Sequence, residues 1–268
     1  VIAGFNAIDF ERSGNNAGTT IDNEESEASP YVGATYAVTE NINTYVSYSD
    51  VYQPQEQYDL SGQFLAPTKG KNFEAGVKAQ WLDDELLTTF AYFTADQENL
   101  AAFAGINPEN QQYYYEGVTV ESEGFEVEVV GQITDALRVQ VSYTAIDVED
   151  EAGNDANLWA RRDVVTFQLG YELPAVPALT VGLGGRWQSE ISNTDYNVEQ
   201  GSYFLANAYA TYAVTNDLTL RANINNIFDE KYKQEVKDIV YGDVEKTTFI
   251  KNKQVDNEKE EEEYFNLG

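Results

Sequence analysis

Two carboxylates, Glu126 and Glu128, have the residue type and spacing that first suggest acid–base chemistry. Their separation by two residues places both side chains on one face of an extended strand, and neither a nucleophile nor a pocket-forming pattern accompanies them. The chain has no histidine and no cysteine, which removes the usual general base, thiolate chemistry and disulfide bonds. We therefore interpret the pair as solvated or salt-bridged groups. We predict that the protein is not an enzyme and has no catalytic residues or cofactor.

Two acidic segments contain oxygen ligands of the kind that Ca²⁺ takes, Asp22 to Glu27 and Asp147 to Asp155. Neither segment has the spacing of an EF-hand loop or of a Gly-Asp repeat. Because carboxylates in loops are commonly solvated, we predict acidic surface loops and no metal site.

The charge balance excludes one class of partner. The chain has 46 acidic and 16 basic residues, for a net charge of -30. Nucleic-acid binding requires clustered Lys and Arg, so the sequence predicts no nucleic-acid partner. An acidic surface keeps a protein soluble, and it also attracts cations over long range. The sequence leaves both interpretations open.

The elements that carry these charged residues are predicted to be strands with two unlike faces. In Lys71 to Leu82, the apolar residues fall on alternate positions and the polar residues fall between them, which is the period of a β-strand. The same period recurs in Ser122 to Ile133, in Leu137 to Asp150 and in Leu218 to Tyr232. In the last segment the polar face carries Arg221 and Asn223, which would need partners in a dry core. This face is expected to meet water or to line a wet lumen.

The connections between the predicted strands alternate in length. Short turns, such as Glu40-Asn41 and Asn216-Asp217, alternate with long polar connections over Asn15 to Ser29, Pro54 to Gly70, Ala101 to Gly117 and Glu149 to Asn157. No apolar run of about 18 residues is present, which excludes a transmembrane helix but not membrane strands of about 9 to 11 residues. We predict an all-β antiparallel up-and-down meander of about twelve strands, forming part of a transmembrane barrel. The alternative is a soluble sandwich or a β-fibre module.

Five segments carry a recognisable pattern along the chain, namely YVSYSDVYQPQ (45–55), KNFEAGVK (71–78), SEGFEVE (122–128), RWQS (186–189) and NNIFDEKY (225–232). In this order and spacing they resemble the C-terminal barrel of TonB-dependent outer-membrane receptors. The resemblance is to the ferric-siderophore branch, of the ferripyoverdine and ferric-coprogen type, and covers roughly residues 1 to 245. It implies a plugged 22-stranded barrel in the outer membrane of a Gram-negative bacterium. It also implies import of a ferric siderophore, energised through TonB, with outer-membrane lipid around the barrel.

The chain departs from the family pattern at both ends. The family has a plug domain and about ten further strands before the position that Val1 occupies, so we expect a fragment. We divide the chain into a barrel part, residues 1–255, and an acidic tail, residues 256–268, which we expect to be disordered. The alternative is a barrel-derived sheet that works outside the membrane, in an extracellular structural or filament-forming assembly closed by neighbouring copies.

The resemblance implies that aromatic and polar side chains of the lumen and of the long loops hold the chelate. The three consecutive tyrosines at positions 113 to 115 are interpreted either as a ligand platform or as loop packing, and the same two interpretations apply to Tyr52 and Trp159. Arg186 would hold an anionic chelate or would pair with lumen carboxylates, and Gln188 shares its polar face, whereas Trp187 is expected to face the membrane interface. The candidate ligand-binding residues are Tyr52, Tyr113, Tyr114, Tyr115, Trp159, Arg186 and Gln188.

Overall fold

The computed structural model describes residues 1–16, 19–158, 160–194 and 197–233, and this part of the chain contains strands and turns but no helix. Eleven strands form one antiparallel sheet, in which β9 pairs with β12, and every other strand pairs with its neighbours in sequence. The strands of this sheet are β1 (Ile2–Asn16), β2 (Thr19–Ala37), β3 (Ile42–Gln53), β4 (Thr68–Trp81), β5 (Leu86–Ile106), β6 (Tyr113–Thr134), β7 (Leu137–Asp150), β8 (Asp163–Glu172), β9 (Leu179–Gln188), β12 (Tyr203–Thr215) and β13 (Leu218–Ile224).

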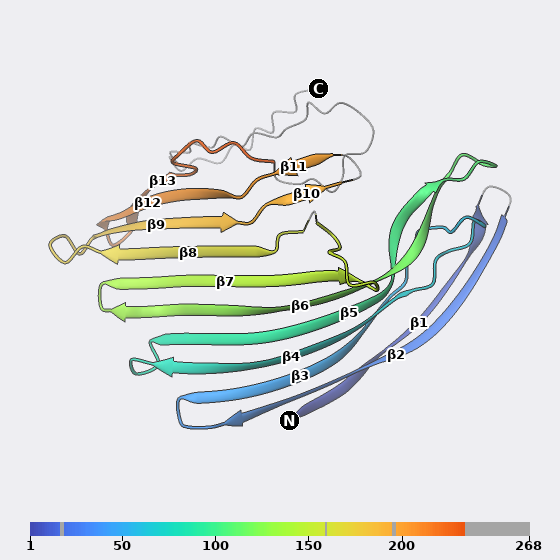
Figure 1. The fold of residues 1–268 in the computed structure, drawn as a ribbon. Coiled ribbons are helices and arrows are strands. Elements are labelled where there is room, and N and C mark those ends of the chain that lie inside the picture. The colour runs from blue at the N-terminus through green and yellow to red at the C-terminus, as the bar shows by residue number, and fades with distance from the viewer. Residues whose placement is uncertain (17–18, 159, 195–196, 234–268) are drawn as a thin grey trace.

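The predicted meander is confirmed, whereas the predicted alternation of short turns and long loops holds only in part. Short turns join strands at one end of the sheet, and the longest connections, such as residues 54–67, lie at the other end (Figure 1). The connection between β9 and β12 contains a separate small hairpin, β10 (Ile191–Asn193) and β11 (Val198–Gln200). We call the two ends the short-turn end and the loop end.

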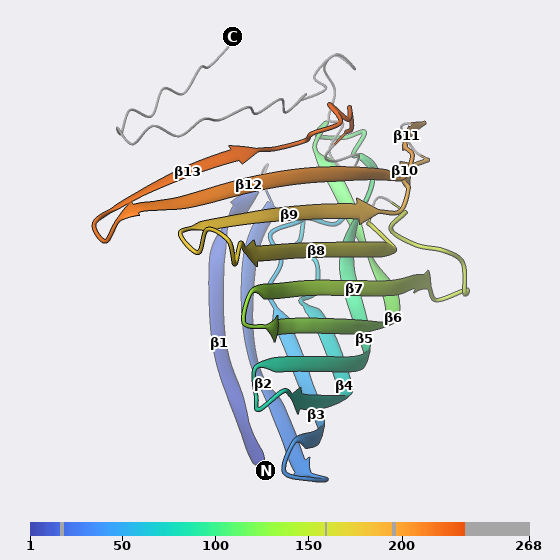
Figure 2. The ribbon, with the colours of Figure 1, turned by 90° about the vertical axis from the view of Figure 1, so that its left-hand side faces the viewer.

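The sheet is a single curved layer. It curls around a central space, and its edge strands, β1 and β13, are not paired with each other (Figure 2). Contacts between the described strands join sheet neighbours and the β10–β11 hairpin, and no second sheet packs on either face. A soluble sandwich is therefore not what the described residues form. Large apolar side chains remain partly exposed, such as Phe73 at 42% and Trp81 at 48%, because no core covers them.

The prediction of a long loop over Asn15 to Ser29 was wrong. The segment continues the first hairpin, in which β1 and β2 pair without interruption from Ile2 opposite Gly33 to Asn16 opposite Thr19. The misassignment has a physical cause. Backbone pairing satisfies the peptide groups whatever the side chains are, and a strand with water on both sides shows no polar–apolar alternation.

The prediction of a loop over Ala101 to Gly117 was also wrong. β5 continues to Ile106 and β6 begins at Tyr113, so the connection covers only residues 107–112. Asn107 closes this turn, because its backbone N–H donates to Gln112 O at 2.7 Å and its backbone C=O accepts from Gln111 N at 2.8 Å. Two shifts of register, after Gln97 and after Phe103, interrupt the period of two that the sequence prediction relied on.

Two further predictions concern a transmembrane helix and the C-terminal tail. No helix among the described residues is long and apolar enough to cross a membrane. The predicted disordered tail, residues 256–268, lies outside the described residues.

Candidate functional site

Cross-strand pairing arranges the two predicted faces of the strands into two continuous surfaces. One row of partners from β4 to β7 consists of Val77, Phe90, Val127 and Tyr143. The adjacent row consists of Lys78, Thr89, Glu128 and Ser142. The first row lies on what we call the apolar face and the second on the polar face. This confirms the alternation read from the sequence.

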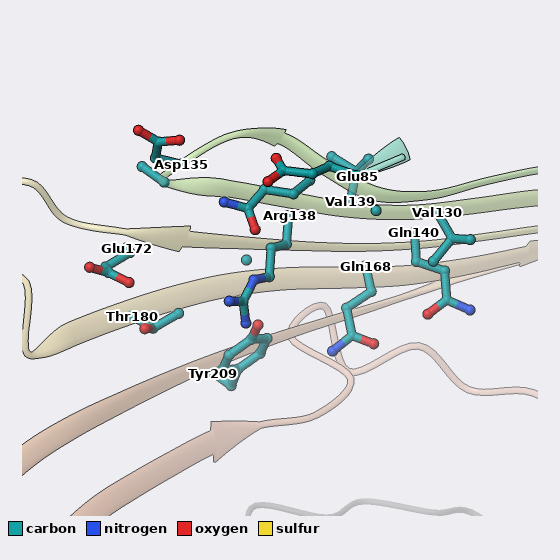
Figure 3. A pocket seen from close by; sticks show the side chains of 14 residues that line it. Glu85, Val130, Asp135, Arg138, Val139, Gln140, Gln168, Glu172, Thr180 and Tyr209 are labelled. Carbon is teal, nitrogen blue, oxygen red and sulfur yellow. The ribbon is translucent and has the colours of Figure 1, made fainter. Parts of the chain in front are cut away.

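The polar face is the concave one. A groove of about 580 Å³ on it is lined by residues of β7 and of β12, although β8 and β9 lie between those two strands. Side chains separated in this way meet only on the inner side of a curved sheet. Figure 3 shows Arg138 of β7 and Tyr209 of β12 projecting into this groove, with Gln140 and Gln168 beside them.

The apolar face changes character towards the loop end. Tyr92 and Tyr143 donate their hydroxyl protons to the carboxylates of Glu123, at 2.7 Å, and of Asp163, at 2.6 Å. Tyrosine suits such a position because its ring is apolar and its hydroxyl needs a polar partner. Beyond these tyrosines the same face bears a cluster of carboxylates, formed by Asp96, Glu121, Glu123, Asp147 and Glu149. On these strands the band of apolar side chains therefore ends at tyrosines that are followed by carboxylates.

Charge is unevenly divided over the polar face. The part formed by β4 and β6 is acidic in its central rows, which carry three carboxylates, Glu74, Glu126 and Glu128, and one cation, Lys78. The hydroxyl of Tyr45 donates to Glu74, and Lys78 Nζ lies 5.3 Å from the centre of the Tyr45 ring. These contacts involve Glu74 and not Glu126 or Glu128, so the interpretation of the latter pair as solvated or salt-bridged groups stays a prediction.

The part of the polar face formed by β7, β8, β9, β12 and β13 is basic. It carries three arginines, one each on β7, β9 and β13. Its two carboxylates lie at the extremes, Glu172 at the short-turn end of β8 and Asp150 at the loop-end tip of β7. The carboxylate of Asp150 is hydrogen-bonded within its own turn, where it accepts from the backbone N–H groups of Ala152 and Asn154, each at 2.9 Å. The arginines are Arg138, Arg186 and Arg221.

Of the predicted ligand-binding residues, Arg186 has an open position on the polar face. It lies two residues from the loop-end terminus of β9, is exposed, and borders a second groove of about 280 Å³. The alternative prediction, a pairing with lumen carboxylates, is not seen among the described residues. No hydrogen bond or ion pair to one of them involves its guanidinium group.

Gln188, in contrast, has no surface exposed to a ligand. Its side chain is 0% exposed, and its Oε1 accepts a hydrogen bond of 2.6 Å from Arg161 Nε. Gln188 is thus part of the support beneath the loop end of β9, and the polar alternation that selected it does not reveal its burial.

A cluster that the sequence interpretation missed holds the connection between β7 and β8 in place. Arg162 Nη2 donates to the carbonyl oxygens of Val148, at 3.0 Å, and Ala156, at 2.6 Å. The hydroxyl of Ser189 accepts from the backbone N–H groups of Arg162, at 3.1 Å, and Asp163, at 3.0 Å. The adjacent arginines preceding β8 are the only sequence signal for this cluster that we find.

The three consecutive tyrosines divide between two faces of β6. Phe103 makes edge contacts with Tyr113 and Tyr115, at centroid distances of 5.7 Å and 6.0 Å. Tyr114 lies over Gly105, where a Cβ atom would be 3.0 Å from its ring. The backbone N–H of Tyr115 donates to Tyr58 O at 2.8 Å, which attaches the connection between β3 and β4 to this hairpin. The aromatic rings pack together and Tyr113 remains exposed, so the choice between a ligand platform and loop packing stays a prediction.

Tyr52 is buried near the loop end of β3, one residue from the end of the strand. By alternation it shares a face with Phe73, so it lies away from the basic part of the polar face. Its hydroxyl donates to Glu25, and burial together with this carboxylate raises its pKa. Trp159 lies outside the described residues. The residues predicted as one ligand site are thus not brought together on one surface.

The acidic segments hold no recognisable metal centre within the ranges that the structure describes, where no group of three or more Asp or Glu side chains could ligate an ion. Asp150 and Asn154 instead close a tight turn, with Asn154 Nδ2 3.1 Å from Asp150 Oδ2.

Comparison with known proteins places this sheet in a family. The family model described as TonB dependent receptor-like, beta-barrel, matches residues 1–227. The ferripyoverdine receptor of Pseudomonas aeruginosa is 33% identical over 245 residues, which cover 85% of this chain and 30% of that protein. The ferrioxamine B receptor of Salmonella typhimurium is 27% identical, covering 82% of this chain and 32% of that protein.

Solved structures agree with the sequence matches. The crystal structure of the ferripyoverdine receptor of Pseudomonas aeruginosa bound to ferripyoverdine has a TM-score of 0.73 and 32% identity, covering 86% of this chain and 32% of that chain. The structure of the alcaligin outer-membrane receptor of Bordetella pertussis has a TM-score of 0.67 and 31% identity, covering 84% of this chain and 39% of that chain. The chain therefore spans about a third of the length of the relatives that it matches. By its sequence and by its fold, it belongs to the family of TonB-dependent receptor-like β-barrels.

Proposed function

We propose that this chain forms the C-terminal part of the barrel of an outer-membrane receptor that imports a ferric siderophore. The observation that carries the proposal is the single-layer sheet, whose apolar face is left uncovered while its concave face is polar. A bilayer covers such an apolar face, and water and ligand occupy the polar side. The proteins that resemble this chain over most of its length include receptors named for ferripyoverdine, ferrioxamine B and alcaligin.

In this proposal the barrel lies in the outer membrane of a Gram-negative bacterium, and TonB supplies the energy for import through a plug domain of the same receptor. The protein carries out no covalent chemistry on its ligand, because binding and passage of an intact chelate require only donors and aromatic surfaces. Among the residues selected from the sequence, Arg186 and Tyr113 remain the proposed ligand contacts, since both are exposed at the loop end.

The test uses the full-length receptor expressed in a Gram-negative host that lacks its own siderophore receptors. We expect the receptor in the outer-membrane fraction, uptake of radiolabelled iron from a ferric chelate, and loss of this uptake when TonB is deleted. Recovery of the receptor as soluble oligomers or filaments would contradict the proposal and favour an extracellular assembly.

A pair of variants tests the ligand contact. Replacement of Arg186 by Gln removes a charged donor and is expected to weaken chelate binding by about 1.5 to 3 kcal/mol. Lys71→Gln is the matched control, because Lys71 is exposed near the loop end but lies on the apolar side of the sheet. Equal binding by both variants and the wild type, measured as the dissociation constant on outer membranes, would exclude Arg186 from the site.

A further inference from the structure

The first hairpin leaves the sheet before it ends. β2 pairs with β3 no further than Tyr31 opposite Ser49, whereas it pairs with β1 over the whole described length of the hairpin. The next residue towards the loop end is Pro30, which has no N–H group to donate to a neighbouring strand. Residues 5–16 and 19–30 therefore form a two-stranded arm at the loop end, and β1 and β2 run on together there (Figure 1).

Two side-chain bonds join one strand of this arm to the sheet. The hydroxyl of Tyr52, on β3, donates to the carboxylate of Glu25. Lys69 Nζ, on β4, donates to Glu27 at 2.7 Å. Glu27, Tyr52 and Lys69 also line one cavity of about 260 Å³ between the arm and the sheet. Tyr52 is only 9% exposed although it lies near the end of its strand, and the arm lies over it.

The other strand of the arm contacts the connection between β3 and β4, residues 54–67, through Arg12. The guanidinium group donates to the backbone oxygen of Gln55 at 3.3 Å and forms an ion pair of 3.5 Å with Glu56. It also lies 4.4 Å from the centre of the Phe64 ring. The side chain of Glu56 is 84% exposed, so this ion pair is close to water and is screened by salt.

The same connection is attached to the β5–β6 hairpin on its other side. Gln55 Nε2 donates to Asn99 O at 2.6 Å, and Gln55 Oε1 accepts from the backbone N–H of Ala101 at 3.1 Å. Asn107 Nδ2 donates to Leu60 O at 2.9 Å. These bonds join neutral amides to backbone groups and are partly buried, so salt weakens them little. The connection is therefore expected to stay with the β5–β6 hairpin, and separation is easiest at the charged contacts of the arm.

We call the contacts of Arg12, Glu25 and Glu27 the latch. We propose that the arm is a flap, which turns about Pro30 and is held closed by the latch. Opening uncovers the cavity beneath the arm and separates the arm from the β3–β4 connection. This device goes beyond the proposed function, and only its consequence for the ligand rests on that function. Tyr113 lies on the β5–β6 hairpin, so a closed latch connects the arm to a proposed ligand contact.

The test measures the distance between the arm and the β5–β6 hairpin in the full-length receptor, without ligand. Spin labels on Ser13→Cys and Glu109→Cys, two exposed positions, report this distance by pulsed electron paramagnetic resonance. We expect a main closed population and a minor open one. Arg12→Gln should raise the ratio of open to closed receptor about twofold to fivefold, the effect of one exposed ion pair. Salt at about 1 M should raise the ratio in the wild type, because it screens the same contacts. Chemical labelling of Tyr52 by a tyrosine reagent, resolved by peptide mass spectrometry, should accelerate by a similar factor, and Arg12→Lys should retain most of the closed population.

Lys71→Gln is the matched control, since Lys71 lines the same cavity but forms no ion pair with the arm among the described residues. Its distance distribution should equal that of the wild type, and an equal change in both variants would overturn the inference. A single distance that neither Arg12→Gln nor salt alters would overturn it as well, because the arm would then be fixed by other contacts. The salt series on the wild type decides the question even if Arg12→Gln fails to fold. Absence of chelate uptake would contradict the proposed function but not the flap, because the distances are measured without ligand.

Discussion

Val127 offers a direct test of which face of the sheet meets lipid. It lies on the apolar face of β6, opposite Phe90 and Tyr143. Four residues towards the loop end, Glu123 is the first carboxylate on this face, and four residues in the other direction, Gly131 pairs with Leu86 at the short-turn end. At about 3.3 Å per residue, Val127 is therefore some 13 Å along the strand from either limit, which is close to the middle of the apolar band.

A lysine at the bilayer midplane of a membrane barrel costs about 2 to 4 kcal/mol, and the cost falls to about 0 to 1 near the interfaces. We therefore expect Val127→Lys to lose about 2 to 4 kcal/mol of folding free energy. Glu128→Lys, at the next residue on the polar face, should lose less than about 1 kcal/mol, because its side chain stays in water. The assay is denaturant-dependent folding of the full-length receptor into phospholipid vesicles, followed by heat-modifiable mobility on gels. Equal losses for the two variants, or a larger loss for Glu128→Lys, would refute the assignment of the faces.

Two further predictions concern the groove floor and a loop turn. A Cβ atom on Gly182 would lie 2.1 Å from the Tyr209 ring, so Gly182→Val should lower the free energy of unfolding by about 1 to 3 kcal/mol, measured by thermal unfolding. Gly184→Ala is the control and should melt like the wild type, because the atom nearest to its Cβ is 3.4 Å away. An unchanged melting temperature for Gly182→Val would contradict the position of Tyr209. Asp150→Asn should make the turn at residues 150–154 more sensitive to protease, because hydrogen bonds from Asn154 and its neighbours lower the pKa of Asp150 and so stabilise its ionised form. Because the pKa is lowered, the stabilisation of the turn by ionised Asp150 is complete above the usual aspartate pKa of about 4 and disappears on further acidification. The difference in proteolysis rate between variant and wild type should therefore disappear at low pH. A difference that is equal at all pH values would contradict this role of Asp150.

The sequence allowed the central strands and their faces to be predicted, because alternation has a period of two wherever one face is wet and the other is apolar. The rows that contain Val77 and Lys78 are as expected for this reason. The prediction failed where that condition fails. Residues 24–27 of β2 are polar at odd and even positions alike, and β5 shifts register twice, after Gln97 and after Phe103. A bulge moves the following side chains to the opposite face without leaving a mark in residue type.

The site was less predictable than the strands for a geometric reason. Alternation placed Arg186 and Gln188 on the same face, yet one is exposed and the other is covered by Arg161, which comes from a connection of irregular structure. The groove depends on Arg138, Gln168 and Tyr209, which belong to three strands that are brought together by curvature and register. Neither quantity is encoded in the pattern of any single strand.

The proposed chelate contact at Arg186 is compatible with a net charge of -30 because of where the nearby carboxylates lie. The carboxylate cluster beyond the tyrosines, which includes Glu121 and Glu149, lies on the opposite face of the sheet from Arg186. Screening reduces interactions between exposed charges beyond about 8 Å at physiological ionic strength. In the proposed site, Arg186 therefore acts on a ligand at contact range, where the distant carboxylates contribute little. The overall charge sums both faces of the sheet, whereas the chemistry at one position of the concave face is set by the residues that alternation directs inwards there.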